Sequence, residues 1–207
     1  MTVKTIRREK GHAAKIEFEN GESILLDLDL LAEKCIHEGD ALGDGQIKEY
    51  LAESEYIRAK SRALWLLDRY TYTERRLLEK LKAARFGAEA AKKAVARLKE
   101  LGLLDDKTLA GRYAEDFAAR GVSKREAYAK LLQKGFKPQD IKETLEDAVF
   151  DEKSQLKTLI ERKYAARLAA GERDKVFAAL VRKGFSYRAV RDALRSRGEE
   201  LEYNGDE

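Results

Sequence analysis

The chain has 207 residues, enough for one or two domains, and 43% of them are hydrophobic, so we expect a packed core rather than wholesale disorder. Charged residues make up 39%, well above the usual quarter, and a single proline disfavours a loop-rich β-sandwich. One cysteine, Cys35, excludes an internal disulfide and a multi-cysteine zinc site. No apolar run approaches the roughly eighteen residues of a membrane span, and the start MTVKTIRREK lacks the apolar stretch of a secretory signal. The composition therefore predicts a cytoplasmic, mainly helical protein.

The net charge of +4 hides an uneven distribution along the chain. Residues 1–53 carry a net charge of −5, residues 54–198 carry +14, and the tail 199–207 carries −5. A body of that positive charge can attract a polyanion or an acidic protein surface. The alternative is that scattered Lys and Arg side chains only solvate helices.

The first 53 residues are expected to form a small appendage that contains a β-hairpin. Residues 15–19 alternate polar and apolar side chains, and residues 23–26 can form the returning strand. Asn20-Gly21 between them favours a type I′ turn. An isolated hairpin is marginal in water, so we expect packing or a third strand. Asp29 and Asp44 stand where helix N-caps would.

The remainder of the chain is repetitive. Residues 81–86, 131–136 and 180–185 share a Leu-x4-Phe unit, whose phenylalanines are 50 and 49 residues apart. An aromatic residue precedes each unit and an i, i+4 apolar pair follows it: Trp65, Tyr113 and Tyr164 before, and Ala91/Val95, Ile141/Leu145 and Val190/Leu194 after. This pattern predicts three units of three helices each, which stack into an elongated, curved rod. Their expected bounds are 54–106, 107–153 and 154–198, followed by the acidic tail 199–207.

Local signals support these helices. Gly135 and Gly184 precede the second and third phenylalanines, at positions suited to the left-handed residue after a helix. Pro138 fits the first turn of the next helix, and Asp105 or Asp106 can cap the helix that opens the second unit.

No catalytic or metal-binding constellation is recognisable in the sequence. His12 and His37 both lie in the appendage, and Cys35 with His37 lacks further cysteine or histidine partners for zinc. Cys35 is expected to be a buried, small apolar residue. Gly43-Asp44-Gly45 lacks the rest of a dinucleotide fingerprint. We therefore expect a protein that is not an enzyme and has no cofactor and no metal.

What remains is a binding surface. Basic residues gather in the second and third helices of each unit, and pairs such as Arg76–Lys80, Arg120–Lys124 and Lys130–Lys134 would share a helix face. Such like-charge neighbours suggest an external partner that neutralises them. The aromatic residues of the repeats are interpreted as core rather than as base-stacking platforms.

At these residues the sequence resembles the RecX family of bacterial recombination regulators. The resemblance spans roughly residues 60–195 and rests on the strings YTERRLLEKL at 72–81, LGLLDD at 101–106, YAEDF at 113–117 and the two Lys-Gly-Phe turns at 134–136 and 183–185. The appended hairpin resembles that of the longer members.

This resemblance implies a protein that lies in the helical groove of the RecA filament on DNA. There it would limit filament growth, ATP hydrolysis, strand exchange and the co-protease activity behind the SOS response, without catalysis and as a monomer. The motifs do not define the contact residues. We place them on the first two units: Arg75, Arg76, Lys80, Arg120, Lys124, Arg125, Lys130 and Lys134.

Two alternatives stay open. The +14 body also suits a stand-alone helical DNA-binding protein, whose binding would be strongly salt-sensitive. The acidic tail is either a solvated terminus or an intramolecular competitor for the basic face.

Overall fold

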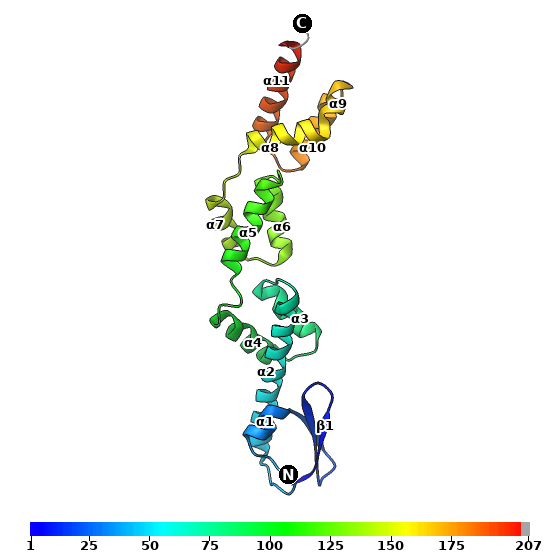
Figure 1. Ribbon diagram of the computed structural model, residues 1–207, viewed down its shortest axis with the longest axis vertical. Helices are drawn as coiled ribbons and strands as arrows, with labels where there is room; N and C mark the ends of the chain where they lie inside the picture. The colour runs from blue at the N-terminus through cyan, green and yellow to red at the C-terminus, as the bar shows by residue number, and fades with distance from the viewer. Residues whose placement is uncertain (204–207) are drawn as a thin grey trace. The chain divides into compact units, whose positions relative to one another are not determined.

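The structure, a computed structural model, describes the backbone of residues 1–203 and the side chains of residues 1–197. The chain forms two compact units, Met1–Leu104 and Asp105–Glu207. As predicted, the protein is mainly α-helical with a small N-terminal β-sheet (Figure 1). The acidic tail lies beyond the described side chains, so its proposed screening role stays a hypothesis.

The N-terminal sheet confirms the hairpin and adds a third strand. Its strands are β1 (Val3–Glu9), β2 (Ala13–Phe18) and β3 (Ser23–Asp27), antiparallel in the order β1-β2-β3. Ile16 of β2 lies opposite Ile6 on one side and Ile24 on the other. Ile16 and Phe18 are fully buried, because alternate residues of β2 face the helix that covers the sheet.

The turn of the hairpin differs from the predicted type I′. Gly21 has φ +85°, whereas Asn20 does not take the positive φ that a type I′ turn requires. The N–H of Gly21 donates to the carbonyl of Phe18 at 3.0 Å, and the N–H of Phe18 donates to the carbonyl of Glu22. This is a three-residue loop in which a type I turn precedes one left-handed glycine.

Both predicted N-caps of the appendage are displaced. Helix α1 (Leu28–Glu33) is capped by Asp27, whose side chain accepts a hydrogen bond from the N–H of Asp29 at 3.0 Å. Asp44 is the first residue of α2 (Asp44–Arg69) rather than its cap. Gly43 precedes it, and its N–H donates to the side chain of Gln46. Helix α2 continues through the expected boundary at residue 53, because no glycine or proline interrupts residues 46–69.

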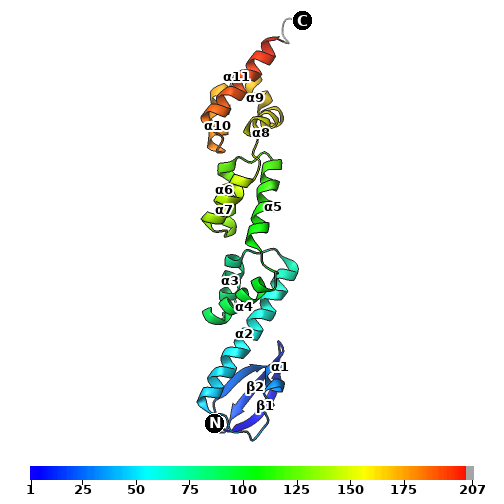
Figure 2. The ribbon, with the colours of Figure 1, turned by 90° about the vertical axis from the view of Figure 1, so that its left-hand side faces the viewer.

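Three helices form one hydrophobic core in the first unit: α2, α3 (Glu74–Ala83) and α4 (Ala88–Glu100). Figure 2 shows α2 running from the sheet to the level of α3 and α4. Its buried stripe, Ala59, Ala63 and Leu66, has helical spacing and meets Leu77 and Leu81 of α3.

The second unit contains two further groups of helices. Helices α5 (Asp106–Ala119), α6 (Lys124–Lys134) and α7 (Pro138–Asp147) enclose a core around Phe136. The second group consists of α8 (Glu152–Leu159), the π-helical turn η1 (Ile160–Tyr164), α9 (Ala165–Ala169), α10 (Arg173–Arg182) and α11 (Tyr187–Tyr203), around Phe185. The first helix of this group is therefore interrupted, which the sequence pattern did not predict.

The predicted local signals in these helices are confirmed. Asp105 caps α5 by accepting from the N–H of Thr108 at 3.0 Å, and Pro138 is the first residue of α7. Gly135 and Gly184 are left-handed, with φ of +95° and +89°. Arg85 occupies the corresponding position in the first unit and also has a positive φ, +67°.

Candidate basic interface

The eight predicted contact residues fall into two groups, one in each unit. Arg75, Arg76 and Lys80 lie on α3, and the others lie between the end of α5 and the end of α6. Each group is described by itself.

Much of the positive charge on α3 is neutralised within the helix. Arg75 Nε and Arg76 Nη1 lie 3.0 Å and 2.9 Å from the two carboxylate oxygens of Glu79. The hydrogen bond from Arg75, followed by that from Arg76, holds the pKa of Glu79 below its ordinary value. Lys80 is exposed and, among the described residues, has no ion pair. It is therefore the one cation of this group that is fully available to a partner.

Two cations of the second group are also paired on their own helices. Arg120 lies 2.8 Å from Asp116, and Lys130 lies 2.9 Å from Glu126. Lys134 sits 4.3 Å from the ring centroid of Tyr113. The expectation that Arg120 and Lys124 share a helix face is wrong, because α5 ends at Ala119 and a turn separates the two residues.

Lys124 and Arg125 are the first two residues of α6. Both are exposed, and neither has an ion pair among the described side chains. Because the N-terminus of a helix already carries partial positive charge, these two side chains add to a positive potential, which Glu126 in the same turn reduces in part. Among the predicted contact residues of this group, Lys124 and Arg125 are therefore where an anionic partner would gain the most binding free energy.

The interpretation of the repeat aromatics as core is wrong for Trp65. Phe136 and Phe185 are buried and Tyr113, Tyr164 and Phe86 are partly buried, but Trp65 is 43% exposed. Trp65 precedes the buried Leu66 by one residue and so lies about 100° away from the buried stripe of α2. The arginines one turn before and after it, Arg62 and Arg69, lie 4.2 Å and 4.0 Å from its ring centroid. The sequence signal for this arrangement was the i, i+3, i+7 spacing of 62, 65 and 69.

A pocket of about 740 Å³ adjoins Trp65 in the first unit. Its lining includes Arg58, Arg62 and Arg85 on one hand and His12, Asp27 and Asp29 on the other. Sequence reasoning did not single out this arginine group, because its members are scattered between helix α2 and the turn after α3.

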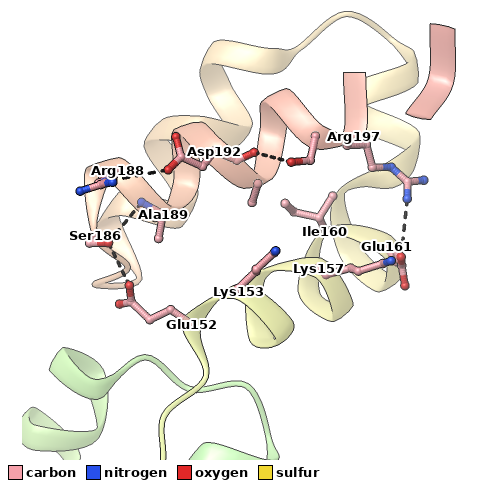
Figure 3. Close-up of a pocket in the computed structure, with 12 residues that line it drawn as sticks. Glu152, Lys153, Lys157, Ile160, Glu161, Ser186, Arg188, Ala189, Asp192 and Arg197 are labelled. Carbon is pink, nitrogen blue, oxygen red and sulfur yellow. Dashed lines mark hydrogen bonds and ion pairs between the residues drawn. The ribbon is translucent and has the colours of Figure 1, made fainter. Parts of the chain in front are cut away.

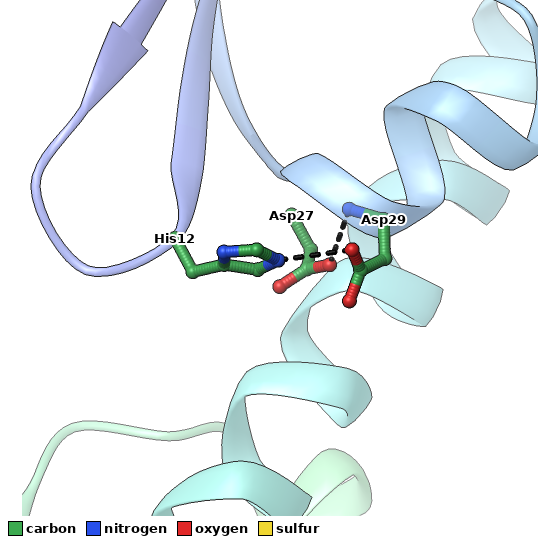
Figure 4. Close-up of side chains that lie close together, drawn as sticks. All are labelled: His12, Asp27 and Asp29. Carbon is green, nitrogen blue, oxygen red and sulfur yellow. Dashed lines mark hydrogen bonds and ion pairs between the residues drawn. The ribbon is translucent and has the colours of Figure 1, made fainter.

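His12, Asp27 and Asp29 are the one group among the described residues whose donor atoms, within 4.8 Å of one another, have the chemistry of a metal site (Figure 4). The fold explains their positions without a metal. His12 Nε2 lies 3.0 Å from an oxygen of Asp29, and Asp27, 3% exposed, caps α1. Cys35 is exposed, so the expectation that it is buried is wrong.

A second pocket, of about 710 Å³, lies between α8, η1 and α11 in the second unit (Figure 3). Its polar side chains mostly satisfy one another: Ser186 donates to Glu152 at 2.9 Å, and Arg197 lies 3.8 Å from Glu161. Ile160 contributes an apolar floor. The pocket thus combines mixed charge with apolar surface.

In the part of the chain that the structure describes, no helix is both long enough and apolar enough to cross a membrane.

Comparison with known proteins decides the family. No family model matches the chain. A regulatory protein RecX of Streptomyces coelicolor is 32% identical over 161 residues, which are 72% of this chain and 85% of the relative. This chain belongs to the RecX family. RecX of Caldanaerobacter subterraneus is 28% identical over 196 residues, 94% of this chain and 98% of the relative.

Solved RecX structures have the same fold. A crystal structure of regulatory protein RecX superimposes with a TM-score of 0.69 at 20% identity, covering 94% of this chain and 98% of that one. RecX from Lactobacillus salivarius gives a TM-score of 0.62 at 20% identity, covering 69% of this chain and 96% of that one. The three-helix groups seen here are thus a family architecture.

Proposed function

We propose that this protein binds the RecA recombinase filament in its helical groove and limits filament extension, ATP hydrolysis, strand exchange and co-protease activity. The observation that carries the proposal is family membership: a regulatory protein RecX matches 94% of the chain over 98% of its own length. The +14 charge of residues 54–198 supports it, because a positive body suits an acidic protein surface or nearby phosphate.

In this proposal the protein acts in the cytoplasm as a monomer and performs no chemistry of its own. Regulation is a matter of binding energy. A protein that binds along a filament and bridges its subunits stabilises one filament state at the expense of extension and turnover. No cofactor or metal is needed for that.

The contact residues are proposed from the charges that the protein leaves uncompensated. All eight predicted cations remain candidates, but we rank Lys80, Lys124 and Arg125 first, because Arg75, Arg76, Arg120 and Lys130 already have carboxylate partners. A partner must compete with those internal pairs, whereas it meets no such competition at Lys124 and Arg125.

The test is an assay with purified RecA. Added to RecA on single-stranded DNA, the full chain should slow ATP hydrolysis and strand exchange at substoichiometric or equimolar amounts. An unchanged rate at several-fold excess would refute the proposal. If inhibition appears only at concentrations at which the protein already covers the single-stranded DNA in the absence of RecA, the protein acts by occupying DNA, and the alternative of a stand-alone DNA-binding protein is favoured.

A charge-reversal variant locates the contact. Lys124→Glu with Arg125→Glu should weaken inhibition about tenfold or more, because it replaces attraction by repulsion at two exposed sites. The matched control is Lys48→Glu, which reverses an exposed charge on α2 within the acidic first 53 residues. Inhibition should be unchanged in that control. Equal effects of both variants would remove Lys124 and Arg125 from the interface.

A further inference from the structure

The pocket beside Trp65 gathers arginines that have no carboxylate partner. Arg58 and Arg62 come from α2 and Arg85 from the turn after α3, and all three line the pocket. Among the described residues none of them forms an ion pair within 4.0 Å, and the same holds for Arg69, on the other side of Trp65. Arg58 Nε is buried without a hydrogen-bond partner.

Other arginines of the same unit behave differently. Arg75 and Arg76 bind Glu79, and Arg97 Nη1 lies 2.9 Å from Glu100. In a unit whose remaining helix arginines are paired, uncompensated guanidinium groups around one pocket indicate a site for an anion.

Trp65 holds two of these arginines in place. With Arg62 and Arg69 at 4.2 Å and 4.0 Å from the ring centroid, the guanidinium groups contact the indole. Contact with the ring restricts their rotamers before a ligand arrives, which reduces the entropy lost on binding. Trp65 is still 43% exposed, so a ligand that binds these arginines can reach its side chain.

Arg85 adds an independent observation. It has φ +67°, the left-handed conformation for which the second and third units use Gly135 and Gly184. A side chain in this conformation is strained, and glycine would relieve the strain. The first unit keeps an arginine there, with its side chain at the pocket. Strain retained at a pocket is typical of a functional position.

The acidic residues of the same lining decide which anion fits. His12 and Asp29 are exposed there, and their side chains are 3.0 Å apart (Figure 4). Carboxylates would repel a ligand that is anionic throughout, such as an acidic peptide. A nucleotide unit carries a phosphate for the arginines, a planar base for the indole, and donor groups that a carboxylate can accept.

We propose that the pocket lined by Arg58, Arg62, Trp65 and Arg85 binds single-stranded DNA, with the phosphates on the arginines and one base against Trp65 and Phe86. A volume of about 740 Å³ is within the range of small-ligand sites and accommodates a nucleotide unit. The site acts without RecA, so its test is independent of the proposed regulatory function.

The readout is intrinsic fluorescence, because Trp65 is the only tryptophan of the chain. Titration of the full chain with an oligothymidylate of about ten nucleotides at low salt should change Trp65 emission in step with the anisotropy of a labelled oligonucleotide. Affinity should fall with salt, with a slope of about 0.7 for each phosphate contact.

Arg85→Gly is the decisive variant, because it removes the charge while relaxing the backbone. It should weaken oligonucleotide binding about three- to tenfold and lower the salt slope by about 0.7, with no loss of stability. Arg62→Gln should weaken oligonucleotide binding and lower the salt slope by similar amounts. Trp65→Ala should weaken binding about 5- to 100-fold, measured by anisotropy. The matched control is Arg97→Gln, a paired arginine on α4, which should bind as the parent protein does.

Any of the following results would overturn the proposal. The first is oligonucleotide binding that is unchanged in both Arg85→Gly and Arg62→Gln. The second is saturation with no change in Trp65 emission. The third is equal competition by a poly-glutamate peptide, which would assign the pocket to acidic protein segments. Free thymidine monophosphate should bind at least tenfold more weakly than the oligonucleotide; equal affinity would assign the pocket to mononucleotides instead.

Discussion

The hydroxyl of Ser123 donates a hydrogen bond of 2.5 Å to the backbone carbonyl of Lys183, sixty residues later in the chain. The same oxygen accepts from the N–H of Glu126 and so caps α6. Ser123 is fully buried. One side chain thus caps the start of a helix in one three-helix group and binds the turn between α10 and α11 of the next, within the second unit.

Ser123→Ala should lower the free energy of unfolding of the second unit by about 1–3 kcal/mol, because it removes a helix cap and leaves the partly buried carbonyl of Lys183 without its donor. Urea unfolding followed by circular dichroism measures this. Ser154→Ala, at an exposed serine of α8, is the control and should change stability by less than about 0.5 kcal/mol. Equal effects of both substitutions would argue against a linking role for Ser123.

Gly184→Ala should destabilise the second unit more than Gly171→Ala does. Both glycines follow a helix with positive φ, +89° and +76°, so both substitutions carry a backbone cost of about 1 kcal/mol. Only at Gly184 would the new Cβ lie 2.7 Å from Ser123 Oγ and 2.9 Å from Arg125 Cβ. Thermal melting of both variants gives the difference, and Ser123→Ala combined with Gly184→Ala should be less damaging than the sum of the two.

Arg85→Gly should raise the stability of the first unit by about 0.5–1 kcal/mol, because glycine takes the left-handed conformation of residue 85 without strain. Lys80→Gly, inside α3, should instead cost about 1 kcal/mol. Denaturant unfolding of the two variants should therefore shift in opposite directions. A loss of stability in Arg85→Gly would show that the arginine makes contacts worth more than the strain.

Asp105 should make stability depend on pH in the acid range. The side-chain hydrogen bond from Thr108, followed by that from its backbone N–H, holds the pKa of Asp105 below its ordinary value of 3.8. A carboxyl whose pKa is lower in the folded state stabilises the fold above its unfolded pKa, and this contribution is lost as the pH falls through the folded pKa.

Asp105→Asn should therefore melt at a lower temperature than the parent protein near neutral pH, and the difference should shrink below about pH 4. Melting curves at several pH values test this. The comparison is needed because Glu79 and Glu172 also have lowered pKa values and contribute to acid sensitivity in both proteins. A difference that stays constant with pH would rule out the ionised cap as its source.

Most of the fold could be predicted from the sequence because its signals are local. The cap at Asp105, the left-handed Gly135 and Gly184, and Pro138 at the start of α7 depend on the backbone conformation of one to four residues. The N-caps predicted in the appendage were wrong by one or two residues, because the sequence offers more than one residue that could act as the cap. Neighbouring acids compete for a cap, and only the path of β3 into α1 decides in favour of Asp27 over Asp29.

The candidate interface was less predictable, since clustering of charge in sequence does not show which charges are already satisfied. Arg75 and Arg76 belong to the same basic cluster of the sequence as Lys80 but differ from it in having Glu79 as a partner. The arginines beside Trp65 were overlooked because they come from two separate segments.

The sequence by itself therefore determined the helical repeats, the N-terminal hairpin and the family, because periodicity, caps and turns act within a few residues of one another. Only the tertiary structure decided that Trp65 is exposed between two arginines, that Arg58, Arg62 and Arg85 share a pocket, and that Ser123 reaches Lys183. These depend on how helix faces pack. When α2 buries the face that carries Leu66, the neighbouring face of the helix stays exposed to solvent. Trp65, one residue before Leu66, therefore lies on the surface and not in the core.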